Sequence, residues 1–272
     1  MLKANPQNDT AAPNGIQRGV AIVTGGRRGI GAAVCRELAR NGFDIAIADI
    51  IADSSGERIV DEVKDLGRNS KFFELDISQV GTHQSFVADV VQALGPISCL
   101  VNNAGLQVPV RGDILEETTD AFDSVVSTNL RGTFFLTQAV ARSMVTAGER
   151  DKLLDSTIIF ITSANASMAS PEKSSYCVSK SALSMVSKLF ALRLADQNIW
   201  VHEIRPGLIQ TDMTAEVFEK YSTAIHDGAS PIRRWGQPHD IAQCVSALAT
   251  RSVGFTTGDV FNIGGGLHIE RL

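Results

Sequence analysis

Tyr176 and Lys180 are the residues whose types and spacing most clearly offer chemistry. The chain has only two tyrosines among its 272 residues, and this one precedes a lysine by four positions in SSYCVSKSAL, residues 174–183. Residues four apart share one face of a helix. An ammonium beside a phenol favours the ionised phenol and lowers its pKa from about 10. The pair could therefore exchange a proton with a substrate, although two helix-surface residues without a role would have the same spacing.

A glycine-rich turn follows the first apolar run. In TGGRRGIGAAV, Gly25, Gly29 and Gly31 would allow a tight turn and a close approach of backbone to phosphate. The N-terminus of the following helix would favour the negative charge. A glycine turn without a ligand is the alternative, but the position within the first strand–turn–helix unit favours a dinucleotide site.

Asp49 ends the second apolar run, 18 residues after Gly31. A carboxylate at this place can accept hydrogen bonds from the adenosine ribose and would repel a 2′-phosphate, which favours NAD. Arg27 and Arg28, in the glycine-rich turn, could instead attract that phosphate and permit NADP. We give Asp49 more weight, because its repulsion acts at the atoms that distinguish the two cofactors.

The elements that must hold these residues appear as short apolar runs bounded by turn residues. The runs are 19–24, 43–49, 70–76, 97–105, 156–163, 199–207 and 258–266. Helical periodicity separates most of them, as in GAAVCRELARNG and ADVVQALG. Strands that are apolar on both faces and alternate with helices indicate a parallel sheet covered on both sides. The sequence therefore predicts a single α/β domain with a doubly wound, seven-stranded parallel sheet.

Two helical segments, 133–145 and 182–195, are apolar around most of their circumference. A helix that covers a sheet needs one apolar stripe, so the additional apolar face needs a partner. We expect these helices to lie in a homo-oligomer interface, as in a dimer of dimers or homotetramer. A helix buried deeply within a monomer is the alternative.

The segment 208–236 follows the end of a predicted strand and has no clean hydrophobic periodicity. We expect it to be a lid over the substrate, or else an ordinary surface excursion.

Composition excludes several classes of protein. Net charge is −5 and no basic stripe is present, so we expect no nucleic-acid partner. The four cysteines and five histidines are scattered, which predicts no metal site and a reducing compartment. Residues 1–18 resemble a disordered arm without the apolar core of a signal peptide, and no run is long enough to span a membrane. These features favour a cytoplasmic protein with a small-molecule substrate.

A series of motifs extends this interpretation over most of the chain, from about 19 to 266. In order, they are Thr24-Gly25-x-x-x-Gly29-x-Gly31, Asp76-Ile77, Asn102-Asn103-Ala104-Gly105, Asn129, Ser163, Tyr176-x-x-x-Lys180 and Pro206-Gly207. Their order and spacing resemble the short-chain dehydrogenase/reductase family. The resemblance implies a Rossmann-fold NAD(P)-binding catalytic domain over 19–272, which interconverts a ketone and a secondary alcohol by hydride transfer.

The resemblance also implies catalytic roles for four residues. Tyr176 would be the general acid in reduction and the base in oxidation. Lys180 and the positive nicotinamide would lower its pKa. Ser163 would donate a hydrogen bond to the substrate oxygen as charge develops, although a strand-end serine is often satisfied by backbone instead. Asn129 would organise the local helix and pass protons through water to Lys180.

The remaining positions that match the family would contact the cofactor. The implied set is Thr24, Gly25, Arg27, Arg28, Gly29, Ile30, Gly31, Asp49, Ile50, Asp76, Ile77, Asn103, Ala104, Gly105, Tyr176, Lys180, Pro206, Gly207, Ile209 and Thr211. Within this set, Asp76 and Ile77 would flank the adenine, and Thr211 would contact the nicotinamide carboxamide. Turn formation and helix capping are alternative reasons for several of these residue types.

The substrate is less strongly indicated. RPGLIQTDM and RRWGQPHDIA look like the bacterial 3-oxoacyl-[acyl-carrier-protein] reductase branch, whose members use a pair of arginines to receive the carrier. Arg142 matches one arginine, but Gln197 stands at the other position, and Asp49 favours NAD where that branch favours NADP. An NAD-dependent polyol, sugar or hydroxy-acid dehydrogenase is the alternative. A nucleotide-binding sensor without turnover is a further alternative, which the complete catalytic set disfavours.

Overall fold

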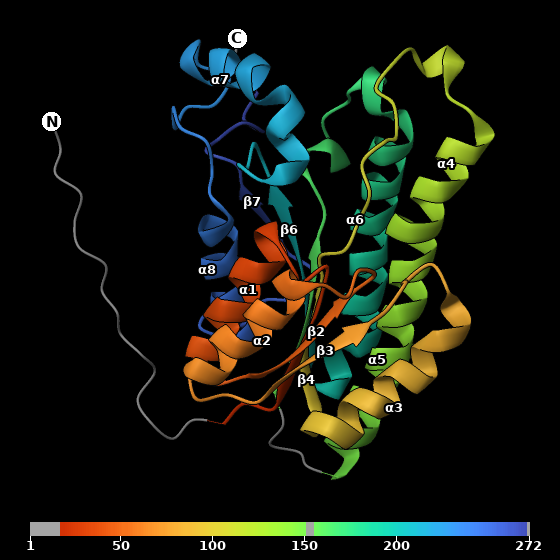
Figure 1. The fold of residues 1–272 in the computed structure, drawn as a ribbon, viewed down its shortest axis with the longest axis vertical. Coiled ribbons are helices and arrows are strands. Elements are labelled where there is room, and N and C mark those ends of the chain that lie inside the picture. The colour runs from red at the N-terminus through yellow and green to blue at the C-terminus, as the bar shows by residue number, and fades with distance from the viewer. Residues whose placement is uncertain (1–16, 151–154, 271–272) are drawn as a thin grey trace, which may run out of the picture.

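The structure is a computed structural model that describes residues 17–150 and 155–270. The arm expected over 1–18 lies outside these residues except for its last two positions. Within the described part, the chain forms one α/β domain in which a central sheet is covered by helices on both faces (Figure 1).

Seven strands form the sheet, each within an apolar run that the sequence analysis identified. They are β1 (Val20–Thr24), β2 (Asp44–Asp49), β3 (Ser70–Glu74), β4 (Ile97–Asn102), β5 (Ser156–Ile161), β6 (Ile199–Pro206) and β7 (Val260–Ile263). All neighbours pair in parallel in the order β3-β2-β1-β4-β5-β6-β7. The strand order reverses between β1 and β4, and ligands of such sheets bind beyond the carboxyl ends at that point.

Helices cover the sheet in two layers, which Figure 1 shows on its two sides. One layer holds α1 (Gly29–Arg40), α2 (Ser54–Asp65) and α8 (Pro238–Ala249), and the other holds α3 (His83–Leu94), α5 (Thr133–Arg150) and α6 (Ser174–Leu194). Alternate side chains of each strand enter the two cores: Ile22 packs toward α3, α5 and α6, whereas Val23 packs toward α1, α2 and α8. The doubly wound fold predicted from the sequence is confirmed.

Helix α6 leaves an apolar stripe uncovered. Val178, Met185, Leu189 and Leu192 are 50–83% exposed, at spacings that place them on one face. On another side, Phe190 of α6 packs against Phe134 of α5, with their ring centroids 5.4 Å apart. The expected second apolar face is therefore present on α6.

The segment 208–236 leaves the sheet after β6 and returns close to its starting point. Gln210 donates its backbone N–H to Gly236 O at 2.9 Å, and Gly236 donates to Leu208 O at 2.9 Å. Between these ends lie a 3-10 segment, Asp212–Val217, and α7 (Phe218–His226), which stands beyond the carboxyl edge of the sheet (Figure 1).

None of the described helices has the length and apolar content needed to cross a lipid bilayer.

Candidate active site

Tyr176 and Lys180 lie in the first turns of α6, where this helix begins beside the carboxyl edge of the sheet (Figure 1). Both side chains are buried, with 7% and 4% exposure. Lys180 Nζ lies 5.7 Å from the centroid of the Tyr176 ring and donates a hydrogen bond to Ile161 O at 3.1 Å. The two residues therefore share one helix face, as their spacing predicts.

The charge balance around Tyr176 differs from the expectation. Burial raises the pKa of Tyr176, and a hydrogen bond with Ser163 and the nearby charge of Arg111 oppose this shift only in part. Lys180 is not among the groups that lower it. Burial also lowers the pKa of Lys180 itself to about 8, opposed by the Glu203 carboxylate. The expectation that Lys180 lowers the pKa of Tyr176 is therefore wrong for the protein chain alone.

Ser163 follows β5 and faces Tyr176. Its backbone is extended, with φ −173° and ψ 159°, and its Oγ accepts a hydrogen bond from Asn165 N at 3.1 Å. This bond caps the short 3-10 turn Ala164–Ala166, which is the backbone role considered as an alternative. The hydroxyl proton is still free to point toward Tyr176, so the structural role and a catalytic role are compatible.

Asn129 lies within a π-helical segment, Ser127–Gly132, between α4 (Thr119–Val126) and α5. Its side chain is fully buried and bonded to both backbone groups of Leu106: Oδ1 accepts from N at 2.7 Å, and Nδ2 donates to O at 2.9 Å. A Cβ built on Gly105 would lie 3.2 Å from Asn129 Oδ1 and 3.4 Å from Lys180 Nζ. Glycine at 105 therefore keeps open the space that both polar atoms face.

The glycine-rich turn has the shape of a phosphate cradle. A Cβ on Gly31 would lie only 2.1 Å from Gly25 O, so glycine permits α1 to begin directly against the turn. Helix α1 begins after Arg28 without any side chain capping its first N–H groups. Unpaired N–H groups at a helix N-terminus attract anions. The residues present therefore fit the pyrophosphate of a dinucleotide.

Arg27 and Arg28 both face carboxylates. Arg27 is 8% exposed, with Nη1 2.6 Å from Asp53 Oδ2 and Nε 3.6 Å from Asp49 Oδ1. Arg28 is exposed and pairs with Asp212 at 3.4 Å, which joins the glycine-rich turn to the segment 208–236. The positive charge that could have attracted a 2′-phosphate is thus largely countered by neighbouring side chains.

The residues expected around the adenosine gather at the same edge. Thr24 Oγ1 accepts the N–H groups of Asn103 and Ala104, each at 3.0 Å, and so ties the ends of β1 and β4 together. Asp76 Oδ1 accepts Ser78 N at 2.9 Å, and Ile77 is buried. Several of these residues therefore shape the turns beside the proposed cofactor site. Ile50, which follows Asp49, is 57% exposed.

The positions expected near the nicotinamide lie at the base of the segment 208–236. Pro206 ends β6, and a Cβ on Gly207 would lie 2.6 Å from Gly264 Cα. Thr211 approaches the glycine-rich turn, since its Cγ2 lies 3.5 Å from a Cβ built on Gly29. Thr211 also lines an open hollow of about 580 Å³ with Asp212 and Phe218. This arrangement brings the segment 208–236 to the cofactor side of the site.

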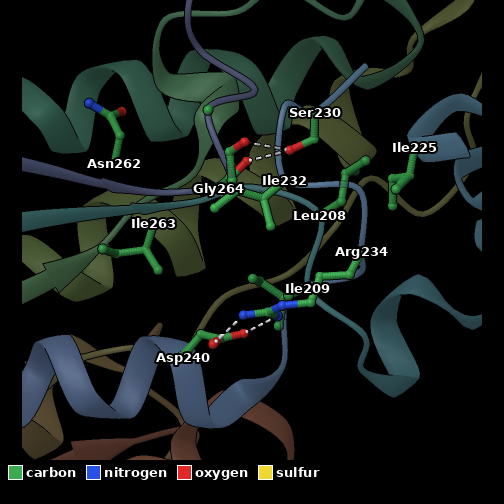
Figure 2. A pocket seen from close by; sticks show the side chains of 13 residues that line it. Leu208, Ile209, Ile225, Ser230, Ile232, Arg234, Asp240, Asn262, Ile263 and Gly264 are labelled. Atoms are coloured by element: carbon green, nitrogen blue, oxygen red, sulfur yellow. Dashed lines mark hydrogen bonds and ion pairs between the residues drawn. The ribbon is translucent and has the colours of Figure 1, made fainter. Parts of the chain in front are cut away.

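A separate cavity of about 290 Å³ lies between this segment and the end of β7 (Figure 2). Isoleucine side chains form much of its lining, the Ser230 hydroxyl bonds to the carbonyls of Gly264 and Gly265, and Arg234 pairs with Asp240 at 2.7 Å. Ile209 is the only predicted site residue in its lining, and Ser163, Tyr176 and Lys180 do not contribute to it. This cavity is therefore distinct from the catalytic group.

Sequence reasoning missed four charged residues around the site. Glu203 on β6 is fully buried and bonds to Thr162 and Ser184, while Glu117 accepts hydrogen bonds from Ser174 Oγ and Ser175 N at the start of α6. Asp53 holds Arg27, and Arg111 lies close enough to influence Tyr176. These residues come from loops or single strand positions outside the motifs, so spacing along the chain gives no signal for them.

Comparisons with known proteins agree with this geometry. A family model described as Enoyl-(Acyl carrier protein) reductase matches residues 25–268. The crystal structure of a 3-oxoacyl-[acyl-carrier protein] reductase from Brucella melitensis in complex with NAD has a TM-score of 0.90 and 43% identity, covering 95% of this chain and 100% of its own.

Two sequence relatives cover similar lengths. Nodulation protein G from Azospirillum brasilense is 32% identical over 252 residues, which is 92% of this chain and 98% of the relative. The 3-oxoacyl-[acyl-carrier-protein] reductase FabG from Staphylococcus epidermidis is 28% identical over 250 residues, with the same coverage of 92% and 98%. The similarity therefore extends over nearly the whole chain.

Proposed function

The chain belongs to the short-chain dehydrogenase/reductase family of NAD(P)-dependent enzymes that interconvert ketones and secondary alcohols, and we propose that Tyr176 is its general acid and base. One observation carries this proposal: the buried Tyr176 hydroxyl bonds with Ser163, and Lys180 lies one helical turn further on. The phenol, the hydroxyl donor and the amine thus meet at the carboxyl edge of the sheet.

In this proposal, each of the chain's own residues has a separate task in ketone reduction. Ser163 donates a hydrogen bond to the substrate oxygen as negative charge develops on it. Tyr176 then delivers a proton to that oxygen. Lys180 restores the proton to Tyr176, and its pKa of about 8 suits proton exchange near neutral pH. Asn129 faces the same space as Lys180, and its amide would hold a water that passes protons to Lys180.

A nicotinamide cofactor, when bound, supplies the hydride in reduction and accepts it in oxidation. Gly25, Gly29 and Gly31 with the start of α1 would hold its pyrophosphate. Pro206, Gly207, Ile209 and Thr211 would border its nicotinamide end. The segment 208–236 would act as a lid, because it carries Thr211 and pairs with Arg28 through Asp212.

We further propose NAD as the preferred cofactor. Asp49 ends β2 at the position that accepts the ribose hydroxyls, and Arg27 is occupied by Asp49 and Asp53. The similar Brucella melitensis structure was determined with NAD, which supports this preference. Replacing Asp49 by Ala should raise kcat/KM for NADPH relative to NADH. An unchanged ratio would contradict the assignment.

The best-supported activity is reduction of a 3-oxoacyl-type ketone, as in the named reductases that resemble this chain. An NAD-dependent hydroxy-acid, polyol or sugar dehydrogenase is the second candidate, favoured by Asp49. Of the expected carrier-binding pair, Arg142 is exposed on α5 but Gln197 replaces the second arginine. Binding of an acyl carrier protein therefore stays a proposal, and it depends on Arg142 alone.

The decisive experiment is a substrate panel with NADH and NADPH, run on the wild-type chain and on Tyr176→Phe. Acetoacetyl thioesters, free oxo acids and polyols represent the competing substrate classes. Loss of the phenol should abolish turnover while the dissociation constant for NADH, measured by fluorescence, stays within about twofold. Full activity of Tyr176→Phe would refute the proposed mechanism. NADH binding without turnover of any compound by the wild type would favour the sensor alternative.

A further inference from the structure

The loop between β4 and α4, residues 103–118, spans the site beside the N-terminal end of α6 (Figure 1). It is fastened at both ends. Leu106 is bonded through both backbone groups to Asn129, and Glu117 accepts hydrogen bonds from Ser174 and Ser175. The short 3-10 turn Ile114–Glu116 also packs against the turn that precedes α6. Arg111 stands between these two attachments, so its backbone is held near the catalytic helix.

The Arg111 side chain brings an uncompensated charge to this place. Its Nη1 atom is buried and has no hydrogen-bond partner, and its charge is felt by Tyr176. Among the described residues, no carboxylate lies within 4.0 Å of its guanidinium. The nearest acidic residues in sequence are used elsewhere: Asp113 caps the turn at Leu115, and Glu117 caps α6.

Two other arginines close to the site, Arg27 and Arg205, are paired with carboxylates, unlike Arg111. Arg27 meets Asp53 at 2.6 Å, and Arg205 meets Glu203 at 2.7 Å. Burying part of a guanidinium without a counter-charge costs free energy, which an anionic ligand could recover. Because the loop that carries Arg111 is attached to Asn129 and to the start of α6, that ligand would be part of the substrate itself.

Lys173 adds a second positive group on the same side. Its side chain is 8% exposed, donates a hydrogen bond to Asn165 Oδ1 at 3.3 Å and lies 5.8 Å from the Tyr221 ring centroid. Asn165 in turn donates its N–H to Ser163 Oγ. Within the part of the chain that the structure describes, Lys173 Nζ also has no carboxylate within 4.0 Å. Lys173 is thus linked to Ser163 through Asn165.

We propose that Arg111 binds a carboxylate of the substrate, which would select hydroxy acids and the corresponding oxo acids within the second substrate class proposed above. This inference rests on the proposed function. Arginine presents paired donors that match the two oxygens of a carboxylate. The carboxylate keeps its charge through the reaction: the carbonyl carbon gains the hydride from the reduced nicotinamide, and the carbonyl oxygen gains the proton of Tyr176.

The test compares 2-, 3- and 4-oxo acids with their methyl esters, using NADH and three forms of the enzyme: wild type, Arg111→Met and Arg58→Met. Arg58 is an exposed arginine on α2, 64% accessible, and its replacement controls for the loss of one positive charge. For at least one chain length, kcat/KM of the wild type should be higher for the acid than for its ester. In Arg111→Met the value for that acid should fall by about tenfold or more while the ester value changes little, because a charged hydrogen bond is lost.

Equal losses for acid and ester in Arg111→Met would overturn the proposal, as would a wild-type preference for esters that the substitution leaves unchanged. Arg111→Gln, which keeps a polar side chain, guards against a folding defect and should show the same selective loss. Its melting temperature and that of Arg111→Met should match the wild type.

A binding measurement separates this inference from the proposed reaction. Calorimetric titration of the enzyme–NAD complex with butyrate and with butyramide should show a preference for the acid that Arg111→Met removes. Ketone turnover without any acid preference in binding or kinetics would leave the proposed function intact and refute the carboxylate site. Acid-selective binding without turnover of any ketone would refute the proposed function and support the site.

Discussion

At the phosphate loop, the Arg27 guanidinium lies between two carboxylates, and the closer one is not the family position Asp49 but Asp53. Asp53 also caps α2, since its Oδ1 accepts the N–H groups of Ser55 and Gly56. One carboxylate therefore starts a helix and holds an arginine that could otherwise meet a 2′-phosphate. We therefore propose that the cofactor preference of this chain depends on both Asp49 and Asp53.

This pairing predicts that the two acids act together. Asp49→Ala removes the repulsion but leaves Arg27 bonded to Asp53, so we expect only a few-fold gain in kcat/KM for NADPH. Adding Asp53→Asn, which can still cap α2, should release Arg27 and raise NADPH use by about another tenfold, the effect of one charged hydrogen bond. Steady-state kinetics with both cofactors measures this. The absence of any further gain when Asp53→Asn is added to Asp49→Ala would show that Arg27 is not restrained by Asp53.

His202 on β6 gives a second effect at the scale of one residue. It is 0% exposed, and neither ring nitrogen has a hydrogen-bond partner among the described residues. Burial lowers its pKa to about 4, opposed by Asp259. The pKa of His202 in the unfolded chain is about 6.5, so below this pH the unfolded chain binds a proton at His202 that the folded chain does not bind until the pH approaches 4. The contribution of His202 to the free energy of unfolding therefore falls as the pH decreases from about 6.5 to about 4.

Replacing His202 by Leu should remove this dependence. Between pH 8 and pH 5 the wild type should lose about 2 kcal/mol more of its free energy of unfolding than the variant does. Urea unfolding at the two pH values measures the difference, and comparing the two proteins cancels the contribution of the carboxylates common to both. Parallel pH profiles for wild type and variant would contradict the interpretation.

At the scale of elements, Glu203 joins three of them behind the catalytic group. Its carboxylate accepts hydrogen bonds from Thr162 at 2.6 Å and Ser184 at 2.7 Å, and it pairs with Arg205 at 2.7 Å. Thr162 precedes Ser163, and Ser184 lies one helical turn after Lys180. The bonds thus fix the end of β5 and the first half of α6 to β6. Glu203 also favours the protonated form of Lys180.

Glu203→Gln should therefore affect both stability and pH dependence. The free energy of unfolding should fall by about 3 kcal/mol, because Arg205 is left partly buried without its counter-charge. The pKa of Lys180 should fall below its present value of about 8, so the alkaline limb of the kcat/KM profile for reduction should move to lower pH. Arg205→Met leaves the carboxylate in place and serves as the control. A stability loss without movement of the alkaline limb would restrict Glu203 to a purely structural role.

The same elements show how far sequence reasoning reaches. Apolar runs such as VAIVT and STIIFI identify strands because both faces of a parallel sheet are buried, and all seven strands were found in this way. Tyr176, Lys180 and Ser163 could be expected together because they match, in order and spacing, motifs of the family that the chain resembles. Glu203 could not be identified, since its partners come from segments 19 and 41 residues away. The direction of the pKa shift of Tyr176 could not be predicted from the sequence either, because this shift depends on burial and on the charge of Arg111.

At the scale of the whole molecule, the uncovered stripe of α6 is the feature that a single chain does not explain. Val178, Met185, Leu189 and Leu192 keep at least half of their area exposed on the helix that also carries Tyr176 and Lys180. An exposed apolar row of this length favours burial against another protein surface. We expect α6 and the neighbouring α5 to pack against the same helices of a second copy, as one interface of a dimer of dimers.

This assembly predicts a specific response to charge. Met185→Glu with Leu192→Glu would place two carboxylates in the interface of each subunit, and the symmetry of such a pair would bring four together. Light scattering after size exclusion should then show a particle of half the mass or less. Val91→Glu, at a partly exposed position on α3, is the control and should leave the mass unchanged. The stripe lies on the same helix as the catalytic group, so dissociation of the assembly should also reduce activity. When the protein is diluted, activity should therefore fall in parallel with the mass of the particle. An unaltered mass for the double variant would show that the stripe of α6 is not an interface.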